Sequence, residues 1–251
     1  MKKVNLMLSF VLLLITACFN HTVYSTQVPR HARAMYQTEP DIASLVNEVS
    51  PAVVDIYTDC LGINIGEVKN FSRGTGVFVS ADGKILTSSH VTDNACDIFV
   101  YPWIINEKGT RIKQRDVIRM VKDVEFPRSD LTILKPKKSY KPDKFIAVNP
   151  ADADLIEGEI VIYFGRTSIF GQALVVNKTE LIERKQNGET HNTPSFSFGI
   201  SAEPGDSGGP VFNMRGQLVG IISATTINKE QPRTFASLLT PVRTILYLTN
   251  R

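Results

Sequence analysis

The strongest chemical signal in the sequence is the segment Glu203-Pro204-Gly205-Asp206-Ser207-Gly208-Gly209-Pro210. A serine acts as a nucleophile when its hydroxyl is exposed and backbone N–H groups point at the oxyanion that develops during attack. Glycines on both sides of Ser207 allow the tight turn that this requires, including a positive φ. The segment therefore indicates a nucleophilic serine, with the N–H groups of Gly205 and Ser207 as its oxyanion hole. The alternative is a glycine-rich turn between two strands.

The order of residues along the chain restricts the kind of serine site. The same segment fits the G-x-S-x-G pattern of α/β-hydrolases, in which the acid and the histidine follow the serine. All four histidines precede Ser207, however, and no aspartate follows it. The α/β-hydrolase interpretation therefore fails, and the orders His–Asp–Ser and Asp–His–Ser remain.

His90 is the candidate general base. It ends a segment, residues 74–90, in which the pattern predicts a strand, an Asp82-Gly83 hairpin turn and a second strand. A neutral imidazole at that strand end can take the serine proton and return it to the leaving amine. The other histidines are expected to be exposed and without a catalytic role: His21 and His31 in a polar N-terminal stretch, and His191 in a polar loop over 186–194.

Asp130 is the candidate acid that orients the histidine. It stands directly before an apolar strand predicted at 131–134, where its carboxylate can be buried against the imidazole and fix the tautomer. Asp116 and Asp123 are alternatives in the same region, but neither opens a strand of this pattern. The other interpretation is a surface aspartate that caps the strand.

The predicted elements are mostly short strands. Apolar residues at helical spacing over 41–49 predict one helix, which Pro51 ends. Two runs of about six strands follow, separated by a polar link over 135–142, and they indicate an all-β fold of two antiparallel barrels or sandwiches. We expect the first of these units at about 50–140, the second at about 150–240 and a closing helix at 241–250. The predicted strands are 53–57, 76–79, 85–88, 98–101, 117–121, 131–134, 159–164, 172–176, 180–183, 195–200, 209–212, 217–222 and 234–239.

The N-terminal residues predict export. Lys2 and Lys3 precede an apolar run of about a dozen residues, which is too short to span a bilayer and typical of a secretory signal. The run ends in Ile15-Thr16-Ala17-Cys18, which resembles the lipobox of bacterial lipoproteins, whose cysteine is lipidated. We expect a lipoprotein-type signal peptide over 1–18 and a flexible tether over 19–39. The alternative is an ordinary signal peptide cleaved near Ser25.

Composition and cysteine count agree with an exported globular protein. The 251 residues are 43% apolar and 21% charged, and a net charge of +3 with scattered Lys and Arg gives no support for nucleic-acid binding. Without Cys18, Cys60 and Cys96 remain, and we expect them to form a disulfide rather than two free thiols. No zinc-type spacing or phosphate-binding loop occurs, so we expect no metal and no organic cofactor.

Three segments together, 74–91, 130–134 and 204–210, resemble trypsin-like serine proteases. Residues 50–57 and 216–221 are similar to the bacterial HtrA (Deg) branch of that family. The resemblance covers about residues 40–250 and implies a chymotrypsin-like fold of two antiparallel six-stranded β-barrels, barrel one at about 50–140 and barrel two at about 150–240. It implies that His90 and Asp130 come from the first barrel and Ser207 from the second, with the active site in the cleft between them.

Three departures from the family pattern affect the expected regulation. Asp206 stands where the HtrA branch usually has Asn. HtrA proteins usually carry a PDZ domain after the protease, and this chain ends first, so PDZ-gated regulation is not expected. No Ile-Val-Gly-Gly-like segment precedes the fold, so we expect no zymogen step of the digestive-protease kind.

The resemblance also implies where substrate binds. It places the floor of the primary pocket at Ser201 and one wall near Ala224 and Thr225, both uncharged, which favours cleavage after small or medium apolar residues. The backbone of Ser223, Ala224 and Thr225 is expected to pair with the substrate as an added strand. We therefore expect a serine endopeptidase of the bacterial cell envelope or periplasm that acts on proteins or peptides, held at the membrane if Cys18 is lipidated. The alternatives are a catalytically idle protease fold acting as a binding or chaperone-like module, and a serine esterase.

Overall fold

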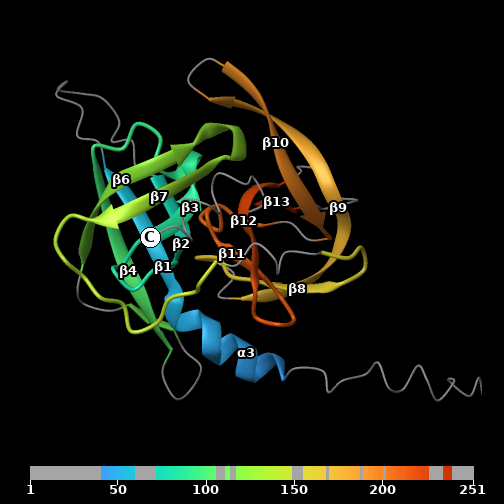
Figure 1. Ribbon diagram of the computed structural model, residues 1–251, viewed down its shortest axis with the longest axis horizontal. Coiled ribbons are helices and arrows are strands. Elements are labelled where there is room, and N and C mark those ends of the chain that lie inside the picture. The colour runs from blue at the N-terminus through green and yellow to red at the C-terminus, as the bar shows by residue number, and fades with distance from the viewer. Residues whose placement is uncertain are drawn as a thin grey trace, which may run out of the picture. The chain divides into compact units, whose positions relative to one another are not determined.

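The structure is a computed structural model, and it describes residues 41–59, 72–105, 111–113, 117–148, 155–167, 170–186, 189–199, 202–225 and 234–238. These residues lie mostly in strands (Figure 1). The predicted signal peptide, tether and closing helix all lie outside the described residues. No described helix is both long and apolar enough to cross a membrane.

The first described element is helix α3, Ile42–Val49. It begins where the Asp41 side chain accepts a hydrogen bond of 3.1 Å from the backbone N–H of Ala43, an N-cap contact that satisfies one orphan donor of the first turn. Leu45 and Val49 on one face are buried in the core. Pro51 lies in the short 3₁₀ turn that follows, η1 (Ser50–Ala52), so the predicted end of the helix is confirmed.

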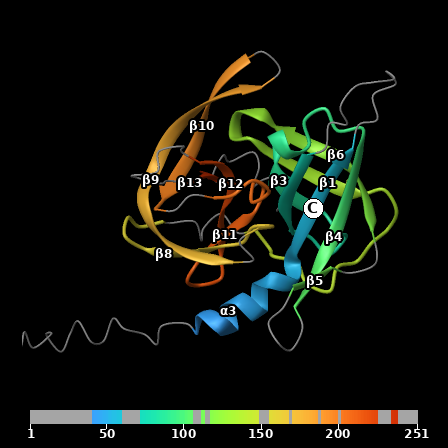
Figure 2. The same cartoon turned by 180° about the vertical axis from the view of Figure 1, so that it is seen from behind.

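The first barrel is closed by strands that are distant in sequence. Its strands run in the spatial order β1-β2-β3-β7-β6-β4, and antiparallel pairing of β4 with β1 closes the circle, while β5 pairs beside β4 (Figures 1 and 2). The bounds are β1 Val53–Asp59, β2 Ser72–Phe78, β3 Ile85–Ser88, β4 Asp97–Ile105, β5 Arg111–Lys113, β6 Ile118–Phe126 and β7 Leu131–Pro136.

The second barrel is closed in the order β10-β13-β12-β11-β8-β9. Its strands are β8 Ile160–Tyr163, β9 Gly171–Gln186, β10 Glu189–Phe198, β11 Pro210–Asn213, β12 Leu218–Thr225 and β13 Thr234–Leu238. The predicted all-β fold of two six-stranded antiparallel barrels is therefore confirmed.

Two details of the predicted second barrel were wrong. The strands predicted at 172–176 and 180–183 are one strand, β9, and β10 begins at Glu189, so His191 lies in a strand opposite Arg184 rather than in a loop. The polar residues near 177–179 looked like a turn, but the strand continues through them beside β10. The register of β9 against β10 shifts between Ser195 and Ser197 and again between Ser197 and Phe198, as it does at a β-bulge. The predicted polar link is also shorter, because Lys135 and Pro136 complete β7.

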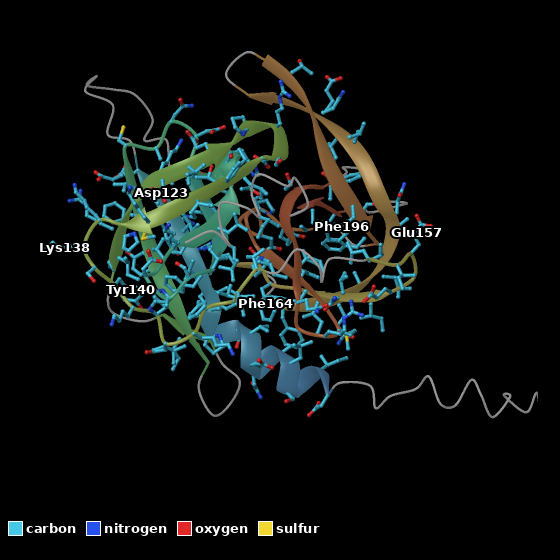
Figure 3. The ribbon with its side chains drawn as sticks, in the orientation of Figure 1. Asp123, Lys138, Tyr140, Glu157, Phe164 and Phe196 are labelled. Carbon is cyan, nitrogen blue, oxygen red and sulfur yellow. The ribbon has the colours of Figure 1, made fainter. Side chains whose placement is uncertain are left out.

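The apolar core of the first barrel continues into the second. Phe164 and Phe212 from barrel two belong to the same buried cluster as Trp103 from barrel one. The rings of Phe164 and Trp103 lie 6.4 Å apart between centroids, and those of Phe164 and Phe212 lie 5.8 Å apart, both edge-on. A separate cluster around Phe196 fills barrel two (Figure 3). The two barrels are thus packed together through aromatic side chains.

Replacing Phe164 with alanine is expected to lower the free energy of unfolding by about 3–5 kcal/mol, because it opens a cavity among buried rings. Urea unfolding followed by fluorescence of the single tryptophan measures the change. Phe145→Ala is the matched control, since that residue is 39% exposed and should cost less. Equal losses in both variants would contradict this account of the core.

Candidate active site

The His90 segment and the Asp130 segment meet because their strands pair. Strands β3 and β7 are antiparallel, with Ser88 opposite Leu131. The residues just after β3 therefore meet those just before β7. His90 lies in the 3₁₀ turn η2 (Ser89–Val91) that follows β3, and Asp130 directly precedes β7. Strand register alone thus brings these two predicted residues together.

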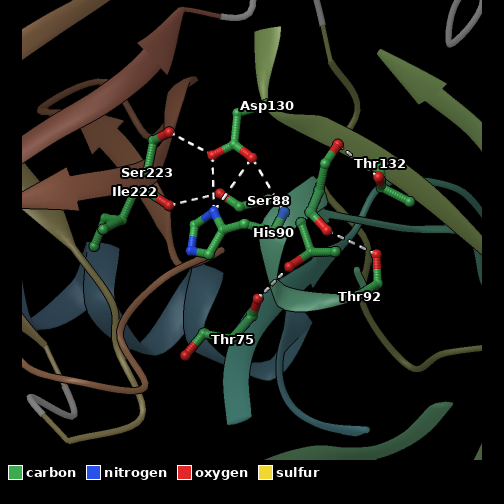
Figure 4. Close-up of polar contacts among 10 residues, drawn as sticks. Thr75, Ser88, His90, Thr92, Asp130, Thr132, Ile222 and Ser223 are labelled. Carbon is green, nitrogen blue, oxygen red and sulfur yellow. Dashed lines mark hydrogen bonds and ion pairs between the residues drawn. The ribbon is translucent and has the colours of Figure 1, made fainter. Parts of the chain in front are cut away.

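Asp130 contacts the His90 turn with both its backbone and its side chain, and Figure 4 shows the side-chain contacts. Its carboxylate Oδ2 lies 2.9 Å from His90 Nδ1, and its Oδ1 accepts the backbone N–H of His90 at 3.1 Å. Its carbonyl accepts the N–H of Ser89 at 3.0 Å. The Asp130 side chain is 3% exposed and that of His90 is 35% exposed. The aspartate is therefore not a surface cap, and the imidazole keeps one side open to solvent.

The backbone of Asp130 is held in an uncommon conformation. It ends the 3₁₀ turn η3 (Pro127–Ser129) with φ 50° and ψ 42°, in the left-handed region. Aspartate tolerates this region better than most residues, but it still costs of order 1 kcal/mol and persists only where the surroundings impose it. Here the N–H bond to Pro127 and the carboxylate bonds to His90 impose it. Asp130 therefore adopts this strained backbone conformation where its carboxylate points at the imidazole of His90.

Barrel two also holds the Asp130 carboxylate. The hydroxyl of Ser223, on β12, donates a hydrogen bond of 2.6 Å to Asp130 Oδ2. One residue earlier, the carbonyl of Ile222 accepts a 2.7 Å hydrogen bond from the hydroxyl of Ser88, next to the histidine turn (Figure 4). The orientation of His90 therefore depends on how the two barrels dock.

The Ser207 loop has the backbone geometry that its glycines predict. Asp206 N–H bonds to Glu203 O at 3.0 Å, with Pro204 second and Gly205 third at φ 103°, features of a type II turn. Among the described residues, the N–H groups of Gly205 and Ser207 donate to no acceptor. Both groups therefore remain the candidates for binding an anionic oxygen.

Thr75 of barrel one anchors this loop of barrel two. Its N–H donates to Ser207 O at 2.8 Å and its hydroxyl donates to Gly205 O at 2.9 Å, while its carbonyl accepts the Thr87 hydroxyl at 2.7 Å. A Cβ on Gly74 would lie 2.6 Å from the Val91 side chain and 2.9 Å from Ser207 O. Gly74 thus lies between the Ser207 loop and the histidine turn, and the structure brings the regions of all three candidate catalytic residues together.

Asp206 ties the nucleophile loop to the segment after β8. Its side chain is fully buried; Oδ1 accepts the Thr167 N–H at 2.9 Å and Oδ2 accepts the Glu203 N–H at 3.1 Å. A Cβ on Gly165 would lie 2.2 Å from the carboxylate, so a glycine is needed there. Asp206 therefore has a structural role built on backbone donors.

The substrate-binding positions are described in part. Ser201 lies outside the described residues. Ala224 and Thr225 pair with β13 at Phe235 and Thr234, and among the described strands none pairs with their other side, which leaves an open edge. The hydroxyl of Ser223 is bonded to Asp130, so a substrate would meet its backbone.

The described part of the chain forms a cavity away from the candidate catalytic residues, but no cluster of metal-ligating side chains. The described residues contain no group of three His, Cys, Asp or Glu side chains that could hold a metal ion. A cavity of about 610 Å³ lies elsewhere on barrel one, at the outer edge where Figure 3 labels Lys138 and Tyr140. Its lining includes none of the candidate catalytic residues.

The sequence did not predict the roles of Thr75 and Ser223 in this network. The only signal for Thr75 was a polar residue between two glycines in a strand, Gly74-Thr75-Gly76. Ser223 was expected to contact substrate through its backbone, and its hydrogen bond to Asp130 was not foreseen. Both contacts cross between the barrels, and strand patterns do not report such contacts.

Two six-stranded barrels, with a His–Asp pair on the first and a serine in a glycine-rich turn on the second, define the chymotrypsin-like fold of serine peptidases. Residues 74–221 match the family described as the trypsin-like peptidase domain. The chain belongs to this family.

Individual relatives fall in the HtrA/Deg branch. A protein named "Probable periplasmic serine endoprotease DegP-like", from Marinomonas sp. (strain MWYL1), is 28% identical over 220 residues, which cover 73% of this chain and 44% of the relative. The chain thus spans less than half the length of the curated relatives it matches.

Solved structures agree on the fold. The active form of the Rv3671c protease from M. tuberculosis superposes with a TM-score of 0.60 at 20% identity, covering 83% of this chain and 87% of that one. The HtrA-type protease AlgW with a decapeptide gives a TM-score of 0.58 at 20% identity, covering 83% of this chain and 66% of that one.

Replacing Thr75 with valine keeps the side-chain shape but removes the hydroxyl that holds Gly205. We expect the rate at which a fluorophosphonate probe labels Ser207 to fall about tenfold, because the turn that carries the Gly205 N–H loses a partly buried hydrogen bond. Thr75→Ser restores the hydroxyl and should react within about threefold of the native protein. A valine variant that is folded by circular dichroism yet reacts at the native rate would contradict the anchoring role.

Proposed function

We propose that this chain is a serine endopeptidase of the HtrA/Deg type. The observation that carries the proposal is the buried Asp130 carboxylate bonded to His90 Nδ1, next to a turn that packs with the Ser207 loop on Gly74. In the proposed roles Ser207 is the nucleophile, His90 the general base and Asp130 the orienting acid. Membership of the trypsin-like peptidase family supports these assignments.

The proposed reaction proceeds through an acyl-enzyme. Because Nδ1 of His90 faces Asp130, its Nε2 carries the lone pair that takes the Ser207 proton as Oγ attacks the scissile carbonyl carbon. The N–H groups of Gly205 and Ser207 bind the oxyanion, a stabilisation of about 3 kcal/mol per donor. The C–N bond then breaks, His90 returns the proton to the leaving amine, and water hydrolyses the ester by the same steps.

The proposed substrates are proteins or peptides in the periplasm. The relatives named as periplasmic endoproteases support the location, and the peptide in the AlgW complex supports peptide binding. The edge of β12 at Ala224 and Thr225, with which no second described strand pairs, suits an added substrate strand, and in this proposal the backbone of Ser223 continues that edge. The uncharged Ser201, Ala224 and Thr225 favour cleavage after small or medium apolar residues.

We also propose a lipid on Cys18 and a disulfide between Cys60 and Cys96. The lipobox-like Ile15-Thr16-Ala17-Cys18 supports the lipid, which would hold the protease at a membrane surface. Cys60 lies outside the described residues. The N–H of Cys96 bonds to the carbonyl of Asp59 at 3.2 Å, which supports the pairing because Cys60 is the next residue in sequence.

Ser207→Ala is expected to abolish fluorophosphonate labelling and to lower kcat for an apolar reporter peptide by about 10⁴-fold or more. His90→Ala should do the same, because the serine loses its base. Ser139→Ala, at an exposed serine, is the matched control and should leave both signals unchanged.

The same assay separates the alternatives. A native protein that binds peptides but is never labelled would support the idle binding or chaperone-like module instead. Labelling and ester hydrolysis without peptide cleavage would support a serine esterase.

Intact-mass analysis of the mature protein is expected to show a diacylated N-terminal Cys18 and, because oxidation of two thiols to a disulfide removes two hydrogen atoms, a mass lower by two hydrogen atoms than that of the reduced chain. Cys96→Ser should then lower the free energy of unfolding by about 2–4 kcal/mol under oxidising conditions, because the unfolded chain loses a cross-link. Under reducing conditions the variant and native proteins should differ little. A mature chain that begins after Ser25 would contradict lipidation.

A further inference from the structure

Two arginines gather on the ring of Tyr57. The guanidinium carbon of Arg73 lies 5.8 Å from the ring centroid and that of Arg166 lies 5.5 Å from it. Arg73 faces Tyr57 directly across the β1–β2 ladder, whereas Arg166 follows β8 in barrel two. Arg166 Nε also donates a long 3.4 Å hydrogen bond to the Tyr57 hydroxyl, and Tyr101 supports the ring edge-on at 5.2 Å. One arginine from each barrel thus stacks on the Tyr57 ring, and Tyr101 packs edge-on against the same ring.

Arg166 also lies against the oxyanion turn. Its Cδ is 3.5 Å and its Nη1 3.8 Å from the point where a Cβ on Gly205 would stand. The guanidinium therefore neighbours the residue whose N–H is proposed to bind the oxyanion. The positive charge of Arg166 would therefore lie close to the cleaved bond of a bound substrate.

The arrangement of strands defines which side of that bond the arginines face. The Ser207 loop has β12 on one side, where Gly208 N–H bonds to Ile222 O, and β2 on the other, where Thr75 N–H bonds to Ser207 O. An acyl portion that pairs with the open edge of β12 occupies the first side. The leaving-group portion must then continue over the β2 side, where Arg73 stands two residues before Thr75.

The chemistry of this surface favours a carboxylate. Arg73 is exposed and has no ion-pair partner among the described residues. The nearby carboxylate of Asp206 is fully buried, and each of its oxygens already accepts a backbone N–H. A guanidinium stacked on an aromatic ring keeps its N–H donors at the edge, where they can bind a carboxylate in bidentate fashion.

We propose that Arg73, Arg166 and Tyr57 form a subsite for a carboxylate on the leaving-group side of the scissile bond. The ligand is an Asp or Glu side chain in the first or second residue after the cleaved bond, or the free C-terminal carboxylate of a short substrate. This subsite rests on the proposed peptidase function and adds a preference for acidic leaving groups to it.

Quenched-fluorescence peptides that differ at one position test the subsite. One series places Asp, Asn or Lys in the first or second residue after the cleavable bond, and a second series ends there in a free carboxylate or an amide. The native protein is expected to cleave the Asp peptide with kcat/KM about fivefold above the Asn peptide, and the Lys peptide more slowly than either. The two series distinguish a side-chain carboxylate from a terminal one.

The decisive quantity is the ratio of kcat/KM for the Asp peptide to kcat/KM for the Asn peptide, measured for each protein; we call it the Asp/Asn ratio. In the double variant Arg73→Gln/Arg166→Gln the ratio should fall to about one, and high salt should reduce it in the native protein. Arg119→Gln is the matched control: that guanidinium also stacks on a ring, 5.5 Å from the centroid of Phe99, but on β6, and its loss should leave the ratio unchanged.

Two results would overturn the subsite while leaving the peptidase in place: equal cleavage of Asp and Asn peptides by the native protein, or a preference that persists in the double variant. Failure to cleave any peptide, together with absent fluorophosphonate labelling, would instead overturn the proposed function and the subsite with it.

Discussion

The central constraint in this molecule is the burial of the Asp130 carboxylate between two barrels. A carboxylate removed from water is costly unless hydrogen bonds replace its hydration. Here three donors do so: the backbone N–H of His90, its ring nitrogen Nδ1 as an N–H, and the Ser223 hydroxyl from the other barrel. The aspartate is stable in this position only while the barrels remain docked, so the aim of the imidazole is coupled to the packing of the barrels.

A second contact couples the barrels in the opposite direction. Barrel two supplies Ser223 to fix the acid of barrel one, and barrel one supplies Thr75 to fix the serine turn of barrel two. The aromatic packing of Phe164 against Trp103 provides the apolar contact that holds these polar bonds in place. Neither barrel could form the site alone, because each receives from the other one hydrogen-bond donor that orients its own catalytic segment.

Much of this arrangement could be predicted from local patterns. Alternation of apolar residues and turn signals predicted most strands within a few residues. The pairing of β3 with β7, which brings His90 and Asp130 together, joins strands that are not consecutive in the chain, and the local pattern did not predict it. The errors arose where pairing overrode local composition. Strand β9 runs through a polar stretch because β10 satisfies its backbone, and His191 consequently lies in a strand instead of the expected loop. Strand β5 was missed because three residues carry too little pattern.

The sequence by itself determined the chemical types at the site: a serine flanked by glycines that permit positive φ, a histidine ending one strand and an aspartate opening another. It also determined the all-β class, since turn residues and alternation act locally. Only the tertiary structure decided which hydroxyls support that chemistry and which cations surround it. Thr75, Ser223 and the Arg73–Tyr57–Arg166 cluster act through contacts between segments far apart in the chain, and such contacts depend on how closed barrels pack rather than on any local pattern.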